Sequence, residues 1–349
     1  MDRIRLALAL TFGLLLATTA AAQPLRSFKF ATVGNKPSSA AEIYYGVALE
    51  KGWFAEAGID FQPVRMLGTV AYPAIASGDI DGSLYAGTAA VAALRGAPLV
   101  VAFYDPISAP WSLVVNPKKI KSVADLGGAR CVAATGAKSA THVAWAAMID
   151  AAGGNWRTFQ AVGTGQPPQF WIEALRSGTA DCMLGFDAAW TNAARREGFT
   201  SMGYLPDVAP MQTNGLVVSR AALKDPAKRK LITDVIGVFL RVHDYVLAEQ
   251  NRAEVAGMVK AWMNSPKDMQ PEDYRAAVDE LAKLLPPKGV ITDSKVLGNL
   301  LAAGLKYGIY DAADFRSDPT KVDMIKEGLV DQSPVAEAYA RGGPLYRGK

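Results

Sequence analysis

The chain has 349 residues, of which 50% are apolar and 20% are charged, and its formal net charge is +4. This composition is typical of a globular protein with sizeable cores, and it excludes a disordered or fibrous chain. No basic run stands out, so we expect no nucleic-acid partner. A prior of roughly 150 residues per domain predicts two domains.

The first 22 residues predict export. Arg3 and Arg5 precede an apolar run from Leu6 to Ala17, and small residues follow at 20–22. This order is typical of a secretory signal peptide, and the apolar run is shorter than the roughly 20 residues of a membrane-spanning helix. We expect cleavage before Gln23 and a periplasmic mature chain, with an uncleaved anchor as the alternative.

Short β-rich runs then alternate with amphipathic segments, which predicts α/β units with parallel sheets. The first series has expected strands at 28–33, 59–64, 80–85 and 99–104, with helices at 40–52, 69–77 and 88–95. A second series has expected strands at 131–134, 159–162 and 181–185, with helices at 139–152, 168–177 and 188–197. The chain is therefore predicted to form two Rossmann-like lobes.

An internal correspondence supports two lobes. Residues 74–81 (AIASGDID) and 174–181 (ALRSGTAD) share the pattern A-[IL]-x-S-G-x-x-D at the same step of both series. Each helix would end at the glycine, which accepts a left-handed conformation, and a strand would begin at Asp81 or Asp181.

The expected boundaries are 23–110 for the first part of lobe one, 111–215 for lobe two, and 216–349 for the return to lobe one. Two extended segments, 111–116 and 215–219, would form a two-strand hinge between the lobes. From Asp225 the apolar period becomes helical, and further helices are expected at 253–263, 271–285 and 294–306. We expect these helices to cover lobe one.

A ligand of such a fold binds beyond the carboxyl ends of the strands, near helix N-termini. In lobe one these ends supply Asn35, Lys36, Gly68, Thr69, Tyr85, Gly87 and Thr88. In lobe two they supply Lys138, Ser139, Ala140, Thr141, Phe186, Asp187 and Trp190, and Trp111 and Asn214 lie on the crossings.

The segment 135–142 (TGAKSATH) is the strongest local signal. A glycine followed by small hydroxyl residues at a helix start predicts an anion cradle, with an ordinary N-cap as the alternative. Lys36 and Lys138 could face the same anionic group, or be surface lysines. Asp187 could accept hydrogen bonds from a ligand, or cap the following helix. Tyr85, Phe186 and Trp190 would supply apolar surface.

No catalytic or metal motif emerges. The sequence has no G-x-S-x-G elbow, no H-E-x-x-H and no P-loop, and Gln166-Pro167-Pro168 spoils a dinucleotide fingerprint after 163–165. His142 and His243 form no cluster at metal-ligand spacing. We expect no cofactor, no metal and no catalysis, with His142 beside Ser139 as the enzymatic alternative.

Whether Cys131 and Cys182 pair stays open. An oxidising compartment would allow a disulfide, but a bridge between adjacent parallel strands is geometrically awkward.

Residues 48–60 (ALEKGWFAEAGID) resemble the A-x-E-K-G-[WF]-F-x-E-x-G-[IL]-[DE] stretch of the ABC solute-binding proteins for sulfonates, taurine, nitrate and thiamine precursors. The resemblance continues through 73–103, 122–133 (SVADLGGARCVA) and 174–190. The histidine-rich and acidic features of the nitrate and bicarbonate branch are missing, and so is the cysteine-rich iron motif of the fungal pyrimidine synthases.

This resemblance implies a type II periplasmic-binding fold and capture of a small ligand without chemistry. Its usual contact sites would fall at Gly87, Thr88, 137–141, Asp187 and Trp190. The implied partners are the permease and ATPase of an ABC importer, and we expect a monomer. The ligand we expect is a small organic anion, a sulfonate or carboxylate, with a pyrimidine-like heterocycle as the alternative. An enzyme on the same fold, similar to the menaquinone-pathway dehydratases, and a sensory module are the rival functions.

Overall fold

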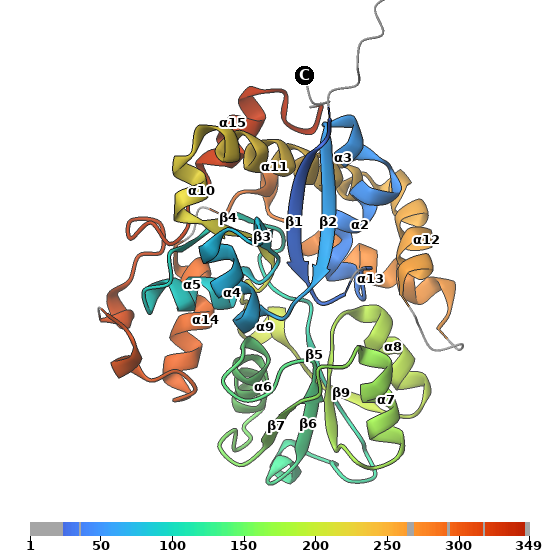
Figure 1. The fold of residues 1–349 in the computed structure, drawn as a ribbon. Coiled ribbons are helices and arrows are strands. Elements are labelled where there is room, and N and C mark those ends of the chain that lie inside the picture. Colours follow the sequence, from blue (N-terminus) through green and yellow to red (C-terminus); the bar gives the residue numbers. More distant parts are fainter. Residues whose placement is uncertain (1–23, 35, 264–268, 292–293, 317, 346–349) are drawn as a thin grey trace, which may run out of the picture.

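Two five-stranded sheets organise the chain, and each is the centre of one lobe (Figure 1). The structure is a computed structural model that describes residues 24–34, 36–263, 269–291, 294–316 and 318–345. The predicted signal peptide and the predicted site residue Asn35 lie outside the described residues.

The first sheet has the order β2-β1-β3-β10-β4. Its strands are β1 (Arg26–Thr32), β2 (Ile59–Arg65), β3 (Gly82–Ser83), β4 (Leu99–Tyr104) and β10 (Gly215–Ser219). Strand β1 pairs in parallel with β2 and β3, whereas β10 is antiparallel to β3 and β4. Its helices are α2 (Ile43–Glu50), α3 (Trp53–Glu56), α4 (Gly68–Ser77) and α5 (Ala86–Leu94).

The second sheet repeats this plan in the order β7-β6-β8-β5-β9. Its strands are β5 (Ser112–Val115), β6 (Arg130–Ala133), β7 (Gln160–Gly163), β8 (Cys182–Gly185) and β9 (Thr200–Tyr204). Strand β6 is parallel to β7 and β8, and β5 is antiparallel to β8 and β9. Its helices are α6 (Ala140–Ala151), α7 (Pro168–Arg176), α8 (Ala188–Arg196) and α9 (Leu205–Val208).

The predicted strands and helices of both series are confirmed. They could be predicted because buried segments leave a pattern of apolar residues in the sequence. Strands β4, β5, β8 and β10 are buried at every residue, which is why they appear as unbroken apolar runs. Strand β9 was not predicted. Its sequence TSMGY lies at a sheet edge and is only partly buried, so it carries no apolar alternation.

The sequence repeat at 74–81 and 174–181 forms the same structural feature in both lobes. The backbone N–H of Lys29 donates to the Asp81 carboxylate at 2.8 Å, and that of Arg130 donates to the Asp181 carboxylate at 2.9 Å. Gly78 and Gly178 both follow the preceding helix with left-handed φ angles of 88° and 75°. Each aspartate therefore ties the start of the third parallel strand to the first one.

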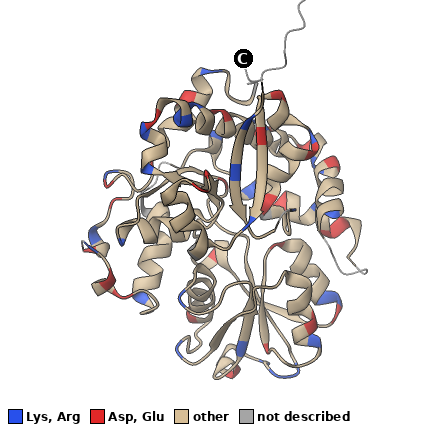
Figure 2. Cartoon of the chain, viewed as in Figure 1, with Lys and Arg blue, Asp and Glu red and all other residues tan. Residues whose placement is uncertain are grey.

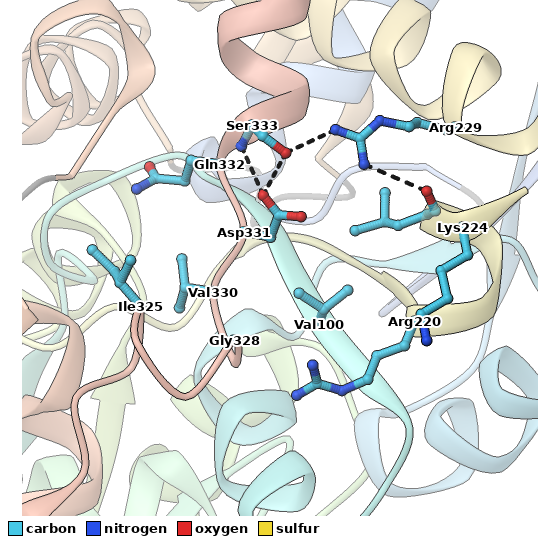
Figure 3. Close-up of a pocket in the computed structure, with 11 residues that line it drawn as sticks. Val100, Arg220, Lys224, Arg229, Ile325, Gly328, Val330, Asp331, Gln332 and Ser333 are labelled. Carbon is cyan, nitrogen blue, oxygen red and sulfur yellow. Dashed lines mark hydrogen bonds between the residues drawn. The ribbon is translucent and has the colours of Figure 1, made fainter. Parts of the chain in front are cut away.

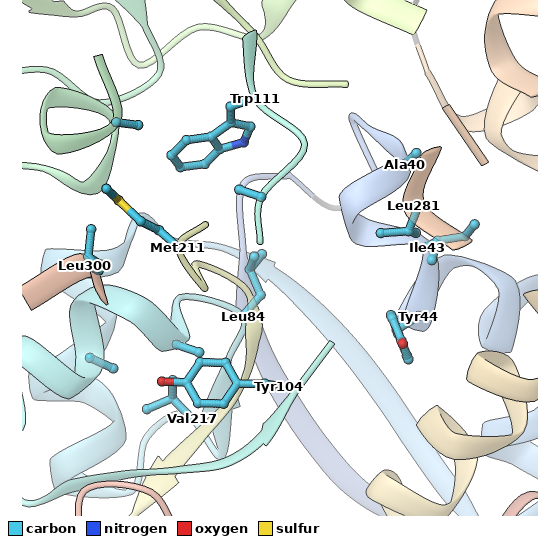
Figure 4. Close-up of a cluster of buried hydrophobic side chains, with 14 of the residues drawn as sticks. Ala40, Ile43, Tyr44, Leu84, Tyr104, Trp111, Met211, Val217, Leu281 and Leu300 are labelled. Atoms are coloured by element: carbon cyan, nitrogen blue, oxygen red, sulfur yellow. The ribbon is translucent and has the colours of Figure 1, made fainter. Parts of the chain in front are cut away.

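The two segments expected to form the hinge are β5 and β10, and each belongs to a sheet. The chain crosses between the lobes just before each of these strands. The crossings run side by side: Ala109 N donates to Met211 O at 2.9 Å, and the Gln212 amide donates to Ile107 O at 2.9 Å. One apolar cluster continues across this junction, from Tyr104 in the first sheet to Trp111 and Met211 at the crossings (Figure 4).

The C-terminal helices are α10 (Arg220–Lys224), α11 (Pro226–Leu247), α12 (Arg252–Trp262), α13 (Pro271–Leu284), α14 (Ser294–Lys306) and α15 (Ser333–Ala340). As expected, Asp225 caps α11, accepting from Ala227 N and Lys228 N. The expectation that these helices cover only lobe one is incomplete. Helix α13 also contacts α8, and α14 contacts α6, so both reach the second lobe (Figure 1).

Cys131 and Cys182 form a disulfide with Cα atoms 4.3 Å apart. The geometric objection to this bridge was wrong, because the two residues are direct register partners on the parallel strands β6 and β8. In the part of the chain that the structure describes, no helix is long and apolar enough to cross a membrane.

Candidate functional site

A groove of about 470 Å³ lies between the two lobes. The first lobe supplies the loop after β1 and the end of β2, and the second lobe supplies the loop after β7 and the start of α7. The lining comprises Val33, Gly34, Lys36, Pro37, Ser38, Arg65, Gly165, Gln166, Pro167, Gln169, Phe170, Trp190 and Trp262. Its position at the carboxyl ends of parallel strands is where this type of sheet places ligands.

The charged side chains that line the groove are cations. Lys36 and Arg65 are the charged residues among the described residues that line it, and no carboxylate lies in this lining. Arg65 also reaches across to the second lobe, where its guanidinium donates to Gly165 O at 3.3 Å. Elsewhere, in the view of Figure 2, the two signs of charge are interspersed. A concave site with two cations and no acid favours an anionic ligand.

Asp187 joins the two lobes. Its carboxylate accepts from Ala40 N of the first lobe at 3.0 Å and from Trp190 N, in the first turn of its own helix α8, at 3.2 Å. The sequence left open whether Asp187 accepts hydrogen bonds from a ligand or caps the following helix. The helix cap is confirmed. Burial raises the pKa of Asp187, and the three backbone N–H groups that face it oppose that shift.

Trp190 adds a second contact between the lobes at the same point. Its indole Nε1 donates to Ser38 O at 3.2 Å, and only 1% of the residue is exposed. Trp190 therefore lines the groove and at the same time holds the loop after β1.

Glu280 of α13 approaches the N-terminus of α8 from the side of the first lobe. Its carboxylate accepts from Ala188 N at 2.7 Å. Burial, followed by the nearby carboxylate of Asp187, raises the pKa of Glu280 to about 7. Two carboxylates from different lobes thus converge on one positive helix end, which partly compensates for their burial.

Glu42 holds the loop that carries Lys36. It lies in the 3-10 turn Ala40–Glu42 and is 4% exposed. Its carboxylate accepts from Ser38 N at 2.6 Å, Ser38 Oγ at 2.7 Å, Thr32 Oγ1 at 2.6 Å and Tyr45 OH at 2.9 Å. Four donors to one buried carboxylate fix the loop after β1 against the first sheet.

Ion pairs farther out also bridge the lobes. Arg196 of α8 pairs with Asp273 of α13, with one N–O distance of 2.9 Å. Lys306 of α14 lies 2.8 Å from Asp150 of α6, which also accepts from Tyr307 OH at 3.0 Å. The structure therefore presents the lobes in contact through α8 with α13 and through α6 with α14.

The predicted anion cradle does not line this groove. Ser139 caps α6 and donates to Gly136 O at 2.5 Å, and Thr141 bonds Thr135, so these hydroxyls are used locally. Lys138 is exposed, its N–H donates to His142 Nδ1, and Ala140 begins α6. The N-cap alternative is confirmed for Ser139, and an anion-binding role of this segment stays a prediction.

The other described strand-end residues predicted in lobe one pack together and are not in the groove lining, so their ligand role stays a prediction. The Thr88 hydroxyl bonds Tyr72 OH, which also donates to Tyr85 O at 3.2 Å. Gly68 begins α4 against the Tyr85 ring, and Thr69 follows it. Gly87 N donates to Thr213 O at 3.2 Å, beside Asn214. The hydroxyls of Tyr85 and Thr213 are buried without a protein partner among the described residues.

Trp111 and Phe186 belong to an aromatic cluster of the second lobe. Their ring centroids lie 6.0 Å apart, and Trp171 lies 5.1 Å from Phe186. Neither residue is in the lining of the groove, and a ligand-binding role of the two stays a prediction.

Sequence reasoning missed Arg65, Ser38, the segment 165–170, Glu42 and Glu280. Arg65 and the segment 165–170 could have been found from the sequence. Arg65 ends β2 and residues 164–167 follow β7, and ligands bind at such carboxyl ends of parallel strands. In the sequence, the run 163–168 shows only a spoiled dinucleotide motif. Glu42 and Glu280 lie on helical segments, and nothing in their sequence context marks them.

Comparisons with known proteins identify a family and solved structures with a similar fold. The family model described as "NMT1/THI5 like" matches residues 40–253. The periplasmic sulfonate-binding protein SsuA from Methylobacillus flagellatus KT is similar in structure, with a TM-score of 0.64, 18% identity, and 93% of this chain and 96% of that chain covered. The periplasmic nitrate-binding protein NrtA from Synechocystis PCC 6803 has a TM-score of 0.67 at 12% identity, covering 91% and 88%.

The same fold also occurs in an enzyme. The desulfurization enzyme DszB has a TM-score of 0.57 at 12% identity, with 91% of this chain and 99% of that chain covered. No curated protein matches the sequence. At these identities the structural neighbours establish the fold, while the family match spans well over half of the chain. The chain belongs to the NMT1/THI5-like family.

Proposed function

We propose that this protein is the periplasmic substrate-binding component of an ABC importer and that it captures a small organic anion, a sulfonate or carboxylate, between its lobes. The observation that carries the proposal is the interlobe groove with Lys36 and Arg65 in its wall and no acid. The family match and the fold shared with sulfonate- and nitrate-binding proteins support it. The predicted signal peptide supports the location.

Binding would act through an equilibrium between open and closed lobes. The contacts of Asp187 with Ala40, Trp190 with Ser38 and Glu280 with Ala188 exist only while the lobes touch. A ligand that contacts Lys36 and Arg65 on one side and the 165–170 segment on the other adds stabilisation to the closed state alone. The closed form, as a monomer, would then deliver the ligand to the permease and its ATPase.

Two other ligand or activity classes remain as alternatives, each with its own observation. The exposed ring of Phe170 at the groove, 53% exposed, would suit an aromatic or pyrimidine-like ligand. The shared fold with DszB is the observation in favour of an enzyme. For an enzyme, we expect turnover of a bound compound rather than its return unchanged.

A thermal-shift screen of the mature protein tests the proposal. The panel holds ethanesulfonate, taurine, benzoate, acetate, nitrate, uracil and leucine. An anion present at about 100 times its Kd should stabilise the protein by about 2.7 kcal/mol. The Lys36→Gln/Arg65→Gln variant should lose that shift, and Lys118→Gln/Lys121→Gln, which removes two exposed charges elsewhere, should keep it. Stabilisation by neutral compounds alone, or conversion of a panel member into product, would contradict the proposal.

A further inference from the structure

A second cavity lies on the first lobe and shares no lining residue with the interlobe groove (Figure 3). Its volume is about 510 Å³, which is in the range of small-molecule sites. Helix α10 forms one wall, and the segment 325–333, which leads into α15, forms the opposite wall.

The floor of this cavity is apolar and held by backbone pairing. Val100 of β4, Leu223 of α10 and Val330 are all buried, and Ile325 is 43% exposed at the cavity. Val101 N donates to Leu329 O at 3.0 Å, and Asp331 N donates to Val101 O at 2.9 Å. The segment 329–331 therefore extends the first sheet, and the floor is a defined part of the fold.

Two cations face this floor without a carboxylate partner. Arg220 and Lys224 stand four residues apart on α10, a spacing that places both on one face of a helix. Neither side chain forms an ion pair or hydrogen bond with another described residue.

The other charged residues of the cavity are already engaged. Arg229 donates to Ser333 Oγ at 2.8 Å and pairs with Glu337. Asp331 accepts from both the N–H and the hydroxyl of Ser333, at 2.9 Å and 2.5 Å (Figure 3). The bonds from Ser333 leave the negative charge of Asp331 in place, so with Arg229 paired to Glu337 the lining holds two further cations, Arg220 and Lys224, against one carboxylate.

We propose that this cavity is a second binding site, which takes a small amphiphilic carboxylate. Its apolar chain or ring would lie on Val100, Val330 and Leu223, and its carboxylate would bond the Arg220 guanidinium and the Lys224 ammonium. A guanidinium presents paired N–H donors that match a carboxylate, and a neighbouring ammonium adds charge. The site is separate from the proposed transport function and does not depend on it.

Calorimetric titration of the mature protein with octanoate tests this site. The wild type should bind, and Arg220→Gln/Lys224→Gln should weaken binding at least about tenfold, since each charge-assisted contact is worth roughly that factor. Wild-type affinity should also fall as salt rises, and the variant should lose most of that salt dependence. The Gln side chains remove the charges and keep part of each aliphatic stem, and an unchanged melting temperature will show that folding is intact.

Two control variants distinguish binding at this cavity from a general effect of charge and from binding in the interlobe groove. Lys228→Gln/Lys260→Gln removes two exposed charges outside both cavities, and it should bind octanoate as the wild type does. Lys36→Gln/Arg65→Gln alters the interlobe groove and should keep the octanoate binding that Arg220→Gln/Lys224→Gln loses. Absence of wild-type binding, or unchanged affinity in Arg220→Gln/Lys224→Gln, would overturn the proposal. Loss of binding only in the groove variant would overturn it too, because octanoate would then occupy the interlobe groove.

Discussion

The carboxylate of Asp187, at the start of α8 in the second lobe, accepts a hydrogen bond of 3.0 Å from the backbone N–H of Ala40 in the first lobe. The same carboxylate caps its own helix through Trp190 N. One buried side chain thus couples a local helix start to the contact between the lobes. This coupling predicts two separable effects of its removal.

Asp187→Ala should lower the free energy of unfolding by about 1 kcal/mol for the lost cap, and more if the Ala40 N–H stays buried without a partner. It should also weaken ligand binding, because the closed state loses a contact that the open state lacks. Urea unfolding and calorimetric titration measure the two effects. Asp225→Ala removes the cap of α11 without touching the second lobe, so it should change stability and leave affinity alone. Equal effects of the two variants on affinity would refute the coupling.

Glu280 should make stability depend on pH. Its pKa is raised from 4.5 to about 7, chiefly by burial and then by Asp187, so the folded protein keeps a proton that the unfolded chain releases between these values. Stability from this group is therefore lost as pH rises from about 4.5 to about 7 and is constant above, a change of roughly 1–3 kcal/mol. Asp187, Tyr204 and Lys283 face the same carboxylate, and their interactions with its charge are part of the pH dependence that the Gln variant removes.

The test compares wild type with Glu280→Gln in urea unfolding from pH 5 to pH 8. The difference between their free energies of unfolding should change across this range in the direction stated, since Gln does not titrate. Parallel curves for the two proteins would show that Glu280 does not carry the dependence.

Glu42→Gln should loosen the loop that carries Lys36. The amide offers one acceptor oxygen where the carboxylate offered two, and its NH₂ group would face donors from Ser38 or from Thr32 and Tyr45. We expect a loss of about 1–3 kcal/mol in stability and weaker anion binding. Glu56→Gln, which breaks a more exposed ion pair with Arg241, is the matched control and should change neither by more than about 0.5 kcal/mol. Wild-type affinity in Glu42→Gln would mean that this loop does not need its anchor.

Removing the disulfide should cost stability and spare binding. The bridge closes a loop with a sequence separation of 51 within the second lobe, and such a constraint is typically worth about 2–4 kcal/mol. Cys131→Ala/Cys182→Ala should lower the urea midpoint by a corresponding amount. Ligand affinity measured well below that midpoint should match the wild type, because both cysteines are buried away from the groove. An affinity loss in a folded variant would contradict this separation of roles.

Much of the fold was predictable because its signals are local. Strands β4 and β10 are continuous apolar runs, and the repeat at Asp81 and Asp181 marks the same step of both lobes. The edge strand β9 was not predictable, because a half-buried edge strand shows no apolar alternation. The disulfide was not predictable either, because the register of β6 and β8 cannot be deduced from the spacing of the cysteines.

The site was less predictable, because it depends on contacts between residues far apart in the sequence. The rule that ligands bind at strand ends points to Lys36 and Trp190, which line the groove. It extends to the ends of β2 and β7, whose Arg65 and Gly165 the prediction omitted. Glu280 meets Ala188 across 92 residues, and only the packing of α13 against α8 creates that pair. Ser139 and Thr141 lie outside the groove lining and bond to groups of their own segment, and sequence alone cannot distinguish such a self-satisfied helix start from an anion site.

The proposed function depends above all on an anion being held between the lobes by Lys36 and Arg65. Its decisive test is calorimetric titration of wild type, Lys36→Gln/Arg65→Gln and Lys118→Gln/Lys121→Gln, each with the anion that gives the largest shift in the thermal screen. We predict that affinity falls at least about tenfold in the groove variant and is unchanged in the control. Equal affinity in all three proteins, with all three folded, would show that Lys36 and Arg65 do not hold the anion.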